Sequence, residues 1–325
     1  MRFTTLAAFA AASLFVATPV LAQDDHADWP SSLTIGTASQ GGTYFIYGTG
    51  LGGLITQELG INASGEVTGG PVQNSTLVET GDHLMGLVTM GPAYEAWTGA
   101  SELAPGVEHK SLRALFPMYQ TPFQAVALTS SGIESVADFD GKRVSVGPAG
   151  GTAATYWPRY FEILGVSPEI SYSGANDAVG QVKDGLIDAF AFAAGVPIAA
   201  FSQIAAENDV NIFGFTEEQR DEILAEMPEM AAFDTPGGLY DGFPEEIPTV
   251  AMWNFAIASE TMPESLAYEI TKLVMENNER MVQIHSAAAE SIVENVDKNT
   301  FMPFHPGAVR YYEEIGIEIP DALRE

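Results

Sequence analysis

Apolar and polar positions along this chain follow two periods, one typical of short buried strands and one typical of amphipathic helices. Near the start, an apolar run at 33–36 precedes a glycine-rich turn, and apolar residues between Tyr47 and Leu59 recur at helical spacing. Further strands are predicted at 66–68 and 84–88, and further helices begin at Pro71 and at 91–92. This alternation predicts an α/β architecture with mostly parallel strands.

The same alternation restarts after residue 125. A predicted strand at 143–146 leads through a glycine-rich turn into a predicted helix at 152–164. Additional strands are predicted at 170–173, 189–192, 210–215 and 250–257. The C-terminal part is predicted to be helical from 263 to about 295 and again at 306–314, with His305 capping the last helix.

One short sequence motif occurs in both halves of the chain. Gly41-Gly42-Thr43 and Gly150-Gly151-Thr152 each lie between a predicted strand and a predicted helix. In an open α/β sheet such turns lie at the carboxyl ends of the strands, where ligands bind. Helix N-termini carry free N–H groups and a partial positive charge. We therefore expect two anion-binding turns, which face each other if two domains meet across a cleft.

The amino-acid composition limits the kinds of partner that this protein can bind. The chain has 325 residues, enough for about two domains, and 46% of them are hydrophobic. Its formal net charge is −30, with acidic residues spread along the whole length. This pattern predicts a solvated acidic surface and disfavours nucleic acid and anionic membranes as partners. The absence of cysteine excludes disulfides, cysteine metal sites and cysteine nucleophiles.

Residues 1–22 have the features of a secretory signal peptide. Arg2 precedes an apolar run from Phe3 to Val16, and the segment closes with Val20-Leu21-Ala22. The alternative is an N-terminal membrane anchor, but the run is short for a span of about 20 residues. We expect cleavage after Ala22 and a periplasmic chain.

Enzyme motifs give no match. Neither glycine-rich turn contains the lysine of a phosphate-binding loop, and the dinucleotide fingerprint and the Gly-x-Ser-x-Gly turn are missing. No two of the five histidines have the spacing of a helical metal-binding pair. We therefore expect no catalytic residue, no metal and no cofactor. A secreted enzyme that uses a paired-carboxylate site stays as an alternative, although no pair is singled out.

Four motifs carry a family resemblance. They are Ile35-Gly36-Thr37 with the turn up to Tyr44, Thr68-Gly69-Gly70-Pro71-Val72-Gln73-Asn74, the segment from Gly141 to Gly147 with its following turn, and Pro303-Phe304-His305-Pro306-Gly307-Ala308. In their order and spacing, the sequence from about Leu33 to Gly316 resembles the TAXI class of solute receptors of tripartite ATP-independent periplasmic (TRAP) transporters.

The resemblance implies a type II-like periplasmic-binding-protein fold of two α/β domains joined by two crossing strands, with a cleft between them. Segments 123–128 and 251–256 resemble the crossings. We expect domain 1 at 23–124 plus 257–325 and domain 2 at 125–256.

The implied function is capture of a small organic anion, such as glutamate, 2-oxoglutarate or a similar carboxylate, and its delivery to the TRAP membrane subunits. We expect a monomer and not an enzyme. The alternative within the binding proteins is a periplasmic sensor that feeds a signalling receptor.

The expected ligand-binding residues lie at strand ends and helix starts. In the first domain they are Gly41, Gly42, Thr43, Tyr44, Gln73, Asn74, Thr89 and Met90, and in the second Gly150, Gly151, Thr152, Ala153, Gly195 and Pro197. Gln73 stands where the family usually has glutamate, which favours a more anionic ligand if the side chain reaches it. Arg159 is the best candidate for a direct ion pair with the ligand, and a surface ion pair is the alternative.

Overall fold

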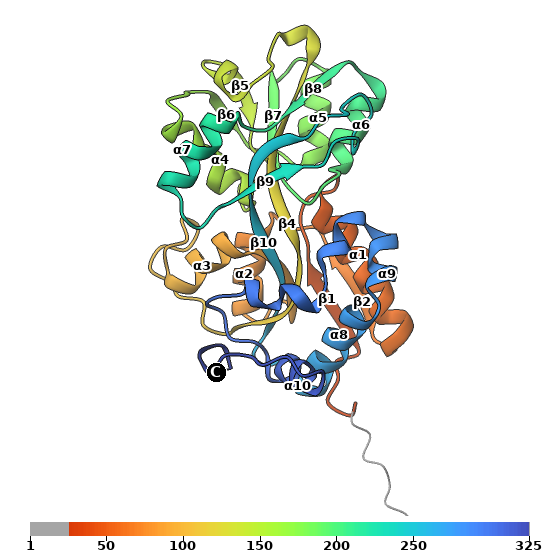
Figure 1. Cartoon of the computed structure of the whole chain (residues 1–325). Helices are drawn as coiled ribbons and strands as arrows, with labels where there is room; N and C mark the ends of the chain where they lie inside the picture. Colours follow the sequence, from red (N-terminus) through yellow and green to blue (C-terminus); the bar gives the residue numbers. More distant parts are fainter. Residues whose placement is uncertain (1–25, 325) are drawn as a thin grey trace, which may run out of the picture.

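The computed structural model describes residues 26–324, so the predicted signal peptide lies outside the described residues. The chain forms two lobes, each with strands flanked by helices, and the lobes meet where two long strands cross between them (Figure 1). Within 26–324 no helix has the length and apolar character needed to cross a membrane.

The first lobe is built from the N-terminal third and the C-terminal segment. Its elements are β1 (Ser32–Gly36), α1 (Thr43–Leu59), β2 (Asn62–Glu66), α2 (Pro71–Glu79), β3 (Met85–Thr89), α3 (Met90–Thr98), α8 (Glu264–Glu276), α9 (Asn278–Ile284) and α10 (Pro306–Glu314). Strand β1 pairs in parallel with β2 and with β3. The carboxyl ends of these strands therefore meet at one edge of the sheet.

The second lobe repeats the arrangement. Its elements are β5 (Arg143–Ser145), α4 (Thr152–Ile163), β6 (Glu169–Ser171), α5 (Ala175–Lys183), β7 (Ala189–Ala193), α6 (Ala199–Glu207), β8 (Val210–Phe213), α7 (Glu217–Glu226) and β9 (Ala231–Thr235). Strand β5 pairs in parallel with β6 and with β7.

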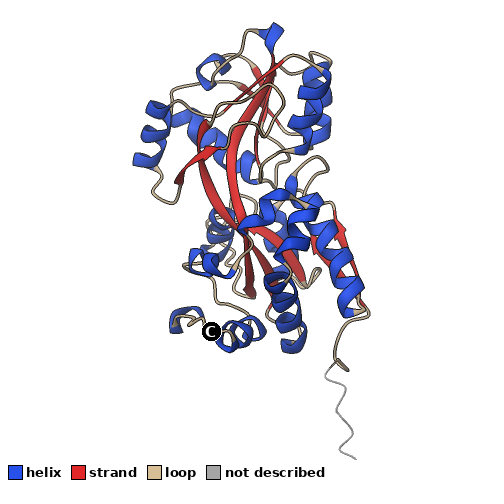
Figure 2. Ribbon diagram, turned by 45° about the vertical axis from the view of Figure 1, so that its right-hand side comes forward, coloured by secondary structure: helices blue, strands red, loops and turns tan. Residues whose placement is uncertain are grey.

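Two long strands join the lobes. They are β4 (Leu112–Leu128) and β10 (Ile247–Ser259), which pair with each other in antiparallel register and run from one lobe into the other (Figure 2). Strand β10 also pairs with β3 in the first lobe and β9 in the second, while β4 pairs with β7 and β8. The predicted crossings at 123–128 and 251–256 are parts of these longer strands.

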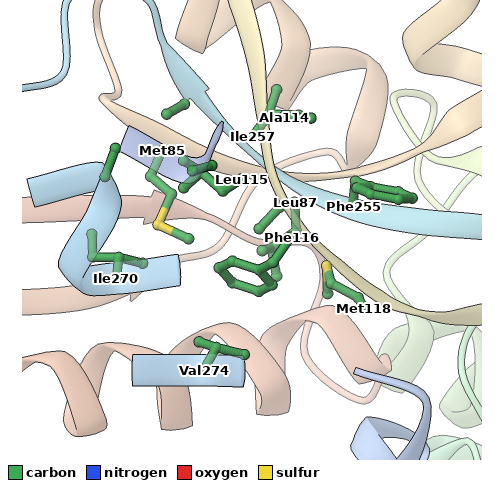
Figure 3. Close-up of a cluster of buried hydrophobic side chains, with 14 of the residues drawn as sticks. Met85, Leu87, Ala114, Leu115, Phe116, Met118, Phe255, Ile257, Ile270 and Val274 are labelled. Atoms are coloured by element: carbon green, nitrogen blue, oxygen red, sulfur yellow. The ribbon is translucent and has the colours of Figure 1, made fainter. Parts of the chain in front are cut away.

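Each lobe has its own buried apolar core. In the first, Phe116 of β4 and Phe255 of β10 pack with Met85 and Leu87 of β3 and with Ile270 of α8 (Figure 3). The second core is rich in aromatic rings, among them Trp157, Tyr160 and Phe123, and the ring centroids of Phe123 and Tyr160 are 5.0 Å apart. Two separate cores joined by only two strands permit the lobes to move relative to each other.

The prediction of mostly parallel strands is wrong, because β4 and β10 pair with all their neighbours in antiparallel register and make the sheet mixed. Most predicted elements are confirmed, with three differences. The second strand lies at Asn62–Glu66 rather than at 66–68, because its small and polar residues show no apolar alternation and the strand depends on pairing with β1. The helical stretch predicted from 263 to 295 breaks at Asn277, after which only α9 and short 3-10 turns follow. Strand β9 has no clear signal in the sequence, since three of its five residues are exposed and it pairs with β10 alone.

Candidate functional site

A small cavity of about 30 Å³ lies between the lobes. Its first-lobe wall and floor are formed by Ala38, Gly42, Thr43, Tyr44, Gly69, Gly70, Pro71, Thr89 and, on β4, Thr121. Its second-lobe wall is formed by Pro148, Gly151, Thr152, Phe192, Ala193 and Ala194. None of these residues carries a charged side chain, so any charge on a ligand must be balanced by the backbone and by neutral polar groups.

Four helices begin at this cavity. The residues that precede α1, α2, α3 and α4 are Gly42, Gly70, Thr89 and Gly151, all on its wall, and none of the four starts has a side-chain cap. Uncapped helix starts leave backbone N–H groups available and produce a positive potential. The cavity is therefore suited to a negatively charged group.

The helix starts differ in the donors they offer. Pro71 at the first position of α2 has no N–H, and the Val72 N–H already donates to the Gly150 carbonyl at 3.1 Å. Helix α3 has a proline, Pro92, in its first turn. The starts of α1 and α4, on opposite lobes, keep their N–H donors without such competition.

A buried amide organises the polar floor of the cavity. The Asn254 Oδ1 on β10 accepts hydrogen bonds from Tyr44 Oη at 2.6 Å, Thr89 Oγ1 at 2.9 Å and Thr121 Oγ1 at 3.1 Å. Burial raises the pKa of the Tyr44 hydroxyl far above its usual value, so this group keeps its proton. Thr89 and Thr152 also share a hydrogen bond of 2.7 Å, which links the lobes at the cavity.

The two lobes are closed onto each other. Helices α5 and α6 of the second lobe direct the N–H groups at their starts to the first-lobe turn that precedes α1. The donors and acceptors are Ala175 N to Ser39 Oγ at 3.2 Å, Asn176 N to Gln40 O at 3.3 Å, and Ala200 N to Gly41 O at 3.1 Å. Thr43 Oγ1 donates to the Gly195 carbonyl. These bonds can form only when the lobes meet.

Glycines allow this close approach. A Cβ atom on Gly150 would lie 3.2 Å from the carbonyl carbon and oxygen of Gly69, in the other lobe. Gly70 has φ +117°, and a Cβ there would lie 2.9 Å from the Gly151 Cα. Larger residues would therefore separate the lobes or force the backbone to shift.

Six of the fourteen expected ligand-binding residues lie on the cavity wall: Gly42, Thr43, Tyr44, Thr89, Gly151 and Thr152. In the first lobe, the Asn74 amide instead donates to the carbonyls of Gly36, Thr37 and Leu87. Gln73 is exposed, and its Oε1 accepts from the Gly69 N–H at 2.6 Å. The substitution of glutamine for glutamate at this position therefore acts on the α2 start and not on the cavity.

Four of the remaining residues lie at contacts between the lobes. Gly41, Gly150 and Gly195 provide carbonyls to the interlobe hydrogen bonds, and the Pro197 carbonyl lies 3.3 Å from His285 Nε2 of the first lobe. Ala153 is buried in the second core. Met90 lines a separate open hollow of about 660 Å³, together with Tyr94, Trp253 and Phe301.

Arg159 does not line the cavity. Its Nη1 lies 2.6 Å from Glu95 Oε1 on α3, and the same carboxylate oxygen accepts from Tyr156 Oη at 3.1 Å. The prediction of an ion pair with the ligand is therefore replaced by an ion pair between lobes, because Glu95 occupies the guanidinium in the closed form.

Phe192 on the cavity wall and Asn254 behind it have only a weak signal in the sequence. Phe192 follows the strand alternation of β7, which is typical of an ordinary core position, yet its ring reaches the cavity. Asn254 is a single amide within the apolar stretch of β10, and that contrast is the signal that could have identified it. Among residues 26–324, no group of three or more histidines or acids is arranged to hold a metal ion.

Solved structures share the fold. MatC from Rhodopseudomonas palustris with bound malate superimposes with a TM-score of 0.57 at 15% identity, over 87% of this chain and 96% of that one. The periplasmic binding protein BugD gives a TM-score of 0.54 at 14% identity, over 88% and 98%. A second R. palustris protein, with adipate, gives 0.54 at 13% identity, over 80% and 89%. The predicted periplasmic-binding-protein fold is confirmed.

A comparison with sequence families also matches most of the chain. A family model described as the NMT1-like family matches residues 35–316, which include both lobes, both crossing strands and every residue of the cavity wall. The chain therefore belongs to the NMT1-like family.

Proposed function

We propose that this protein is an extracytoplasmic solute receptor that captures a small organic anion in the cavity between its lobes and delivers it to the membrane subunits of a TRAP transporter. The observation that carries the proposal is the cavity itself, which is enclosed by both lobes and bordered by four uncapped helix starts. An enclosed site that both lobes complete favours capture by closure.

Three further observations support the ligand class. The cavity lacks charged side chains, so the N–H groups at the helix starts are its means of binding an anion without burying a full positive charge. Two proteins of the same fold hold organic acids, malate and adipate. The motifs that resemble TAXI receptors favour a TRAP transporter as partner, and glutamate and 2-oxoglutarate are the ligands that this resemblance implies.

Release into the transporter then requires that the lobes separate. The interlobe hydrogen bonds are mostly neutral, so opening breaks contacts around the ligand without disturbing either core. The periplasm is the location that such a receptor needs, and export by the predicted signal peptide is part of the proposal.

A thermal-shift screen of residues 23–325 tests the proposal. Organic acids, amino acids, sugars and polyamines are compared at increasing concentration, because a ligand that binds only the folded state raises the melting temperature. A saturable shift with an organic acid, recovered unchanged after incubation, is expected. A shift with a sugar or a polyamine alone would contradict the anion class.

A further inference from the structure

We infer that the cavity selects a short monocarboxylate and excludes dicarboxylates, among them the glutamate and 2-oxoglutarate that the family resemblance implies. This inference rests on the proposed function as a receptor for a small organic anion. The first argument is size. A cavity of about 30 Å³ is far below the roughly 300–1,000 Å³ of sites for drug-sized ligands. The closed form that encloses it is fixed by backbone contacts, such as Gly69 against Gly150, which leave little room for expansion.

The second argument is charge. Two helix starts with free donors, those of α1 and α4, border the cavity from opposite lobes. These two starts offer complete sets of N–H donors for one carboxylate, whereas Pro71 and Pro92 each remove a donor from the starts of α2 and α3. A second carboxylate would find no cationic side chain on the wall, and burying an unpaired charge is costly.

The third argument is the shape of the polar surface. The N–H groups at the starts of α1 and α4 give a polar surface, while Phe192 and Pro148 on the second lobe give an apolar wall. A carboxylate with a short apolar tail matches both surfaces. A molecule with acidic groups at both ends would place one of them against the apolar wall.

Phe192 is the residue that limits ligand length. Its side chain is 6% exposed, and a Cβ on Gly42 or Gly147 would lie within 3.5 Å or 2.9 Å of its ring. The ring is thus held between the turns of both lobes. Replacing it by a smaller residue lengthens the cavity along the apolar wall.

Isothermal titration of the full mature chain tests this inference. The probes are acetate, propionate, pyruvate and lactate against malate, adipate, glutamate and 2-oxoglutarate. We expect one of the monocarboxylates to bind about 100-fold more tightly than any of the four dicarboxylates. A dicarboxylate that binds as tightly overturns the inference and leaves the proposed function standing. If no acid of either group binds, the proposed function fails as well.

Two variants separate selectivity from stability. Phe192→Leu should shift the preference by about tenfold toward a longer monocarboxylate such as hexanoate, because the apolar wall recedes. Phe201→Leu alters the same core without touching the cavity and should leave the preference unchanged. Equal preferences in the wild type and in Phe192→Leu would overturn the assigned role of Phe192.

Discussion

Arg159 on α4 and Glu95 on α3 form an ion pair between the two lobes, with 2.6 Å between Nη1 and Oε1. The Glu95 side chain is 15% exposed and the Arg159 side chain 32%, so solvent screens the pair only in part. The Tyr156 hydroxyl donates to the same carboxylate oxygen, and its ring lies 4.7 Å from the guanidinium. This cluster stabilises the closed form outside the wall of the small cavity.

Glu95→Gln should therefore shift the protein toward the open form. Discounted for partial exposure, the pair is worth about 1 kcal/mol, so the ratio of closed to open molecules should fall about fivefold at low salt. Since the chain has no cysteine, Gly53→Cys and Gly180→Cys provide one label on each lobe, at positions where a Cβ meets open space. Energy transfer between the labels measures the ratio.

The matched control is Glu102→Gln. Glu102 lies 3.9 Å from Arg159 but its side chain is 80% exposed, so its removal should change the ratio little. High salt should reduce the difference between Glu95→Gln and the wild type. Equal energy transfer in the wild type and in Glu95→Gln at low salt would show that the pair does not stabilise closure.

Gly150→Ala should prevent complete closure. The added Cβ would press on the Gly69 carbonyl at 3.2 Å and strain the hydrogen bond from the Val72 N–H to the Gly150 carbonyl. We expect about tenfold weaker binding of the acid that gives the largest thermal shift, because only the closed form completes the site. Titration calorimetry measures the affinity, and small-angle scattering should report a larger radius of gyration with ligand present.

The control for Gly150→Ala is the same substitution at a glycine that has open space around it. Gly180 in α5 has no neighbouring atom within 4 Å of the point that an alanine Cβ would occupy, so Gly180→Ala should bind like the wild type and be slightly more stable. If Gly150→Ala also binds like the wild type, the contact between Gly69 and Gly150 does not limit closure.

Much of the fold was predictable because the strands and helices of each lobe have clear patterns in the local sequence. Apolar runs followed by glycine-rich turns and amphipathic helices located β1, β5, α1 and α4, and His305 was correctly expected to cap α10, since its Nδ1 accepts from the Gly307 N–H. Periodicity could not reveal the full length of β4, because this strand is buried on both faces and so shows no alternation, and because Pro117 and Pro122 interrupt its apolar residues.

Only the parts of the site that consist of backbone turns and helix starts were predictable from the sequence. Thr43 and Thr152 follow from the strand–turn–helix pattern, which fixes their place at a helix start. Whether a neighbouring side chain reaches the cavity depends on how the lobes close, which is a long-range property. For that reason local patterns assign Gln73 and Arg159 to the ligand although they contact protein, and Phe192 to the core although it lines the cavity.

Asn254→Ala should destabilise the protein strongly. The side chain is fully buried, and it accepts from Tyr44, Thr89 and Thr121 while it donates to the Tyr119 carbonyl at 2.5 Å. Removing it leaves several buried groups without partners, so we expect a loss of about 3 kcal/mol in the free energy of unfolding by urea. Asn62→Ala, at an exposed position of β2, should change it by less than about 0.5 kcal/mol. A loss as small as that of the control would mean that the network contributes little to stability.

His305 should make the fold sensitive to acid. Burial lowers the pKa of this imidazole from 6.5 to about 4, and the neutral ring both caps α10 through Nδ1 and lies 3.0 Å from the Met262 carbonyl through Nε2. Because the unfolded chain takes up the proton at higher pH than the folded one, stability is complete above about pH 6.5 and falls as the pH drops toward 4. The loss approaches about 3 kcal/mol for this residue.

His305→Asn tests this dependence, since asparagine can also cap a helix but does not titrate. Urea unfolding at several pH values between 7 and 4.5 should show a smaller decline for His305→Asn than for the wild type, whatever the two stabilities at pH 7. Burial lowers the pKa of His285 as well, so part of the decline should remain. His26→Asn, at an exposed position, should follow the wild-type curve. A decline in His305→Asn as steep as in the wild type would assign the acid sensitivity to other groups.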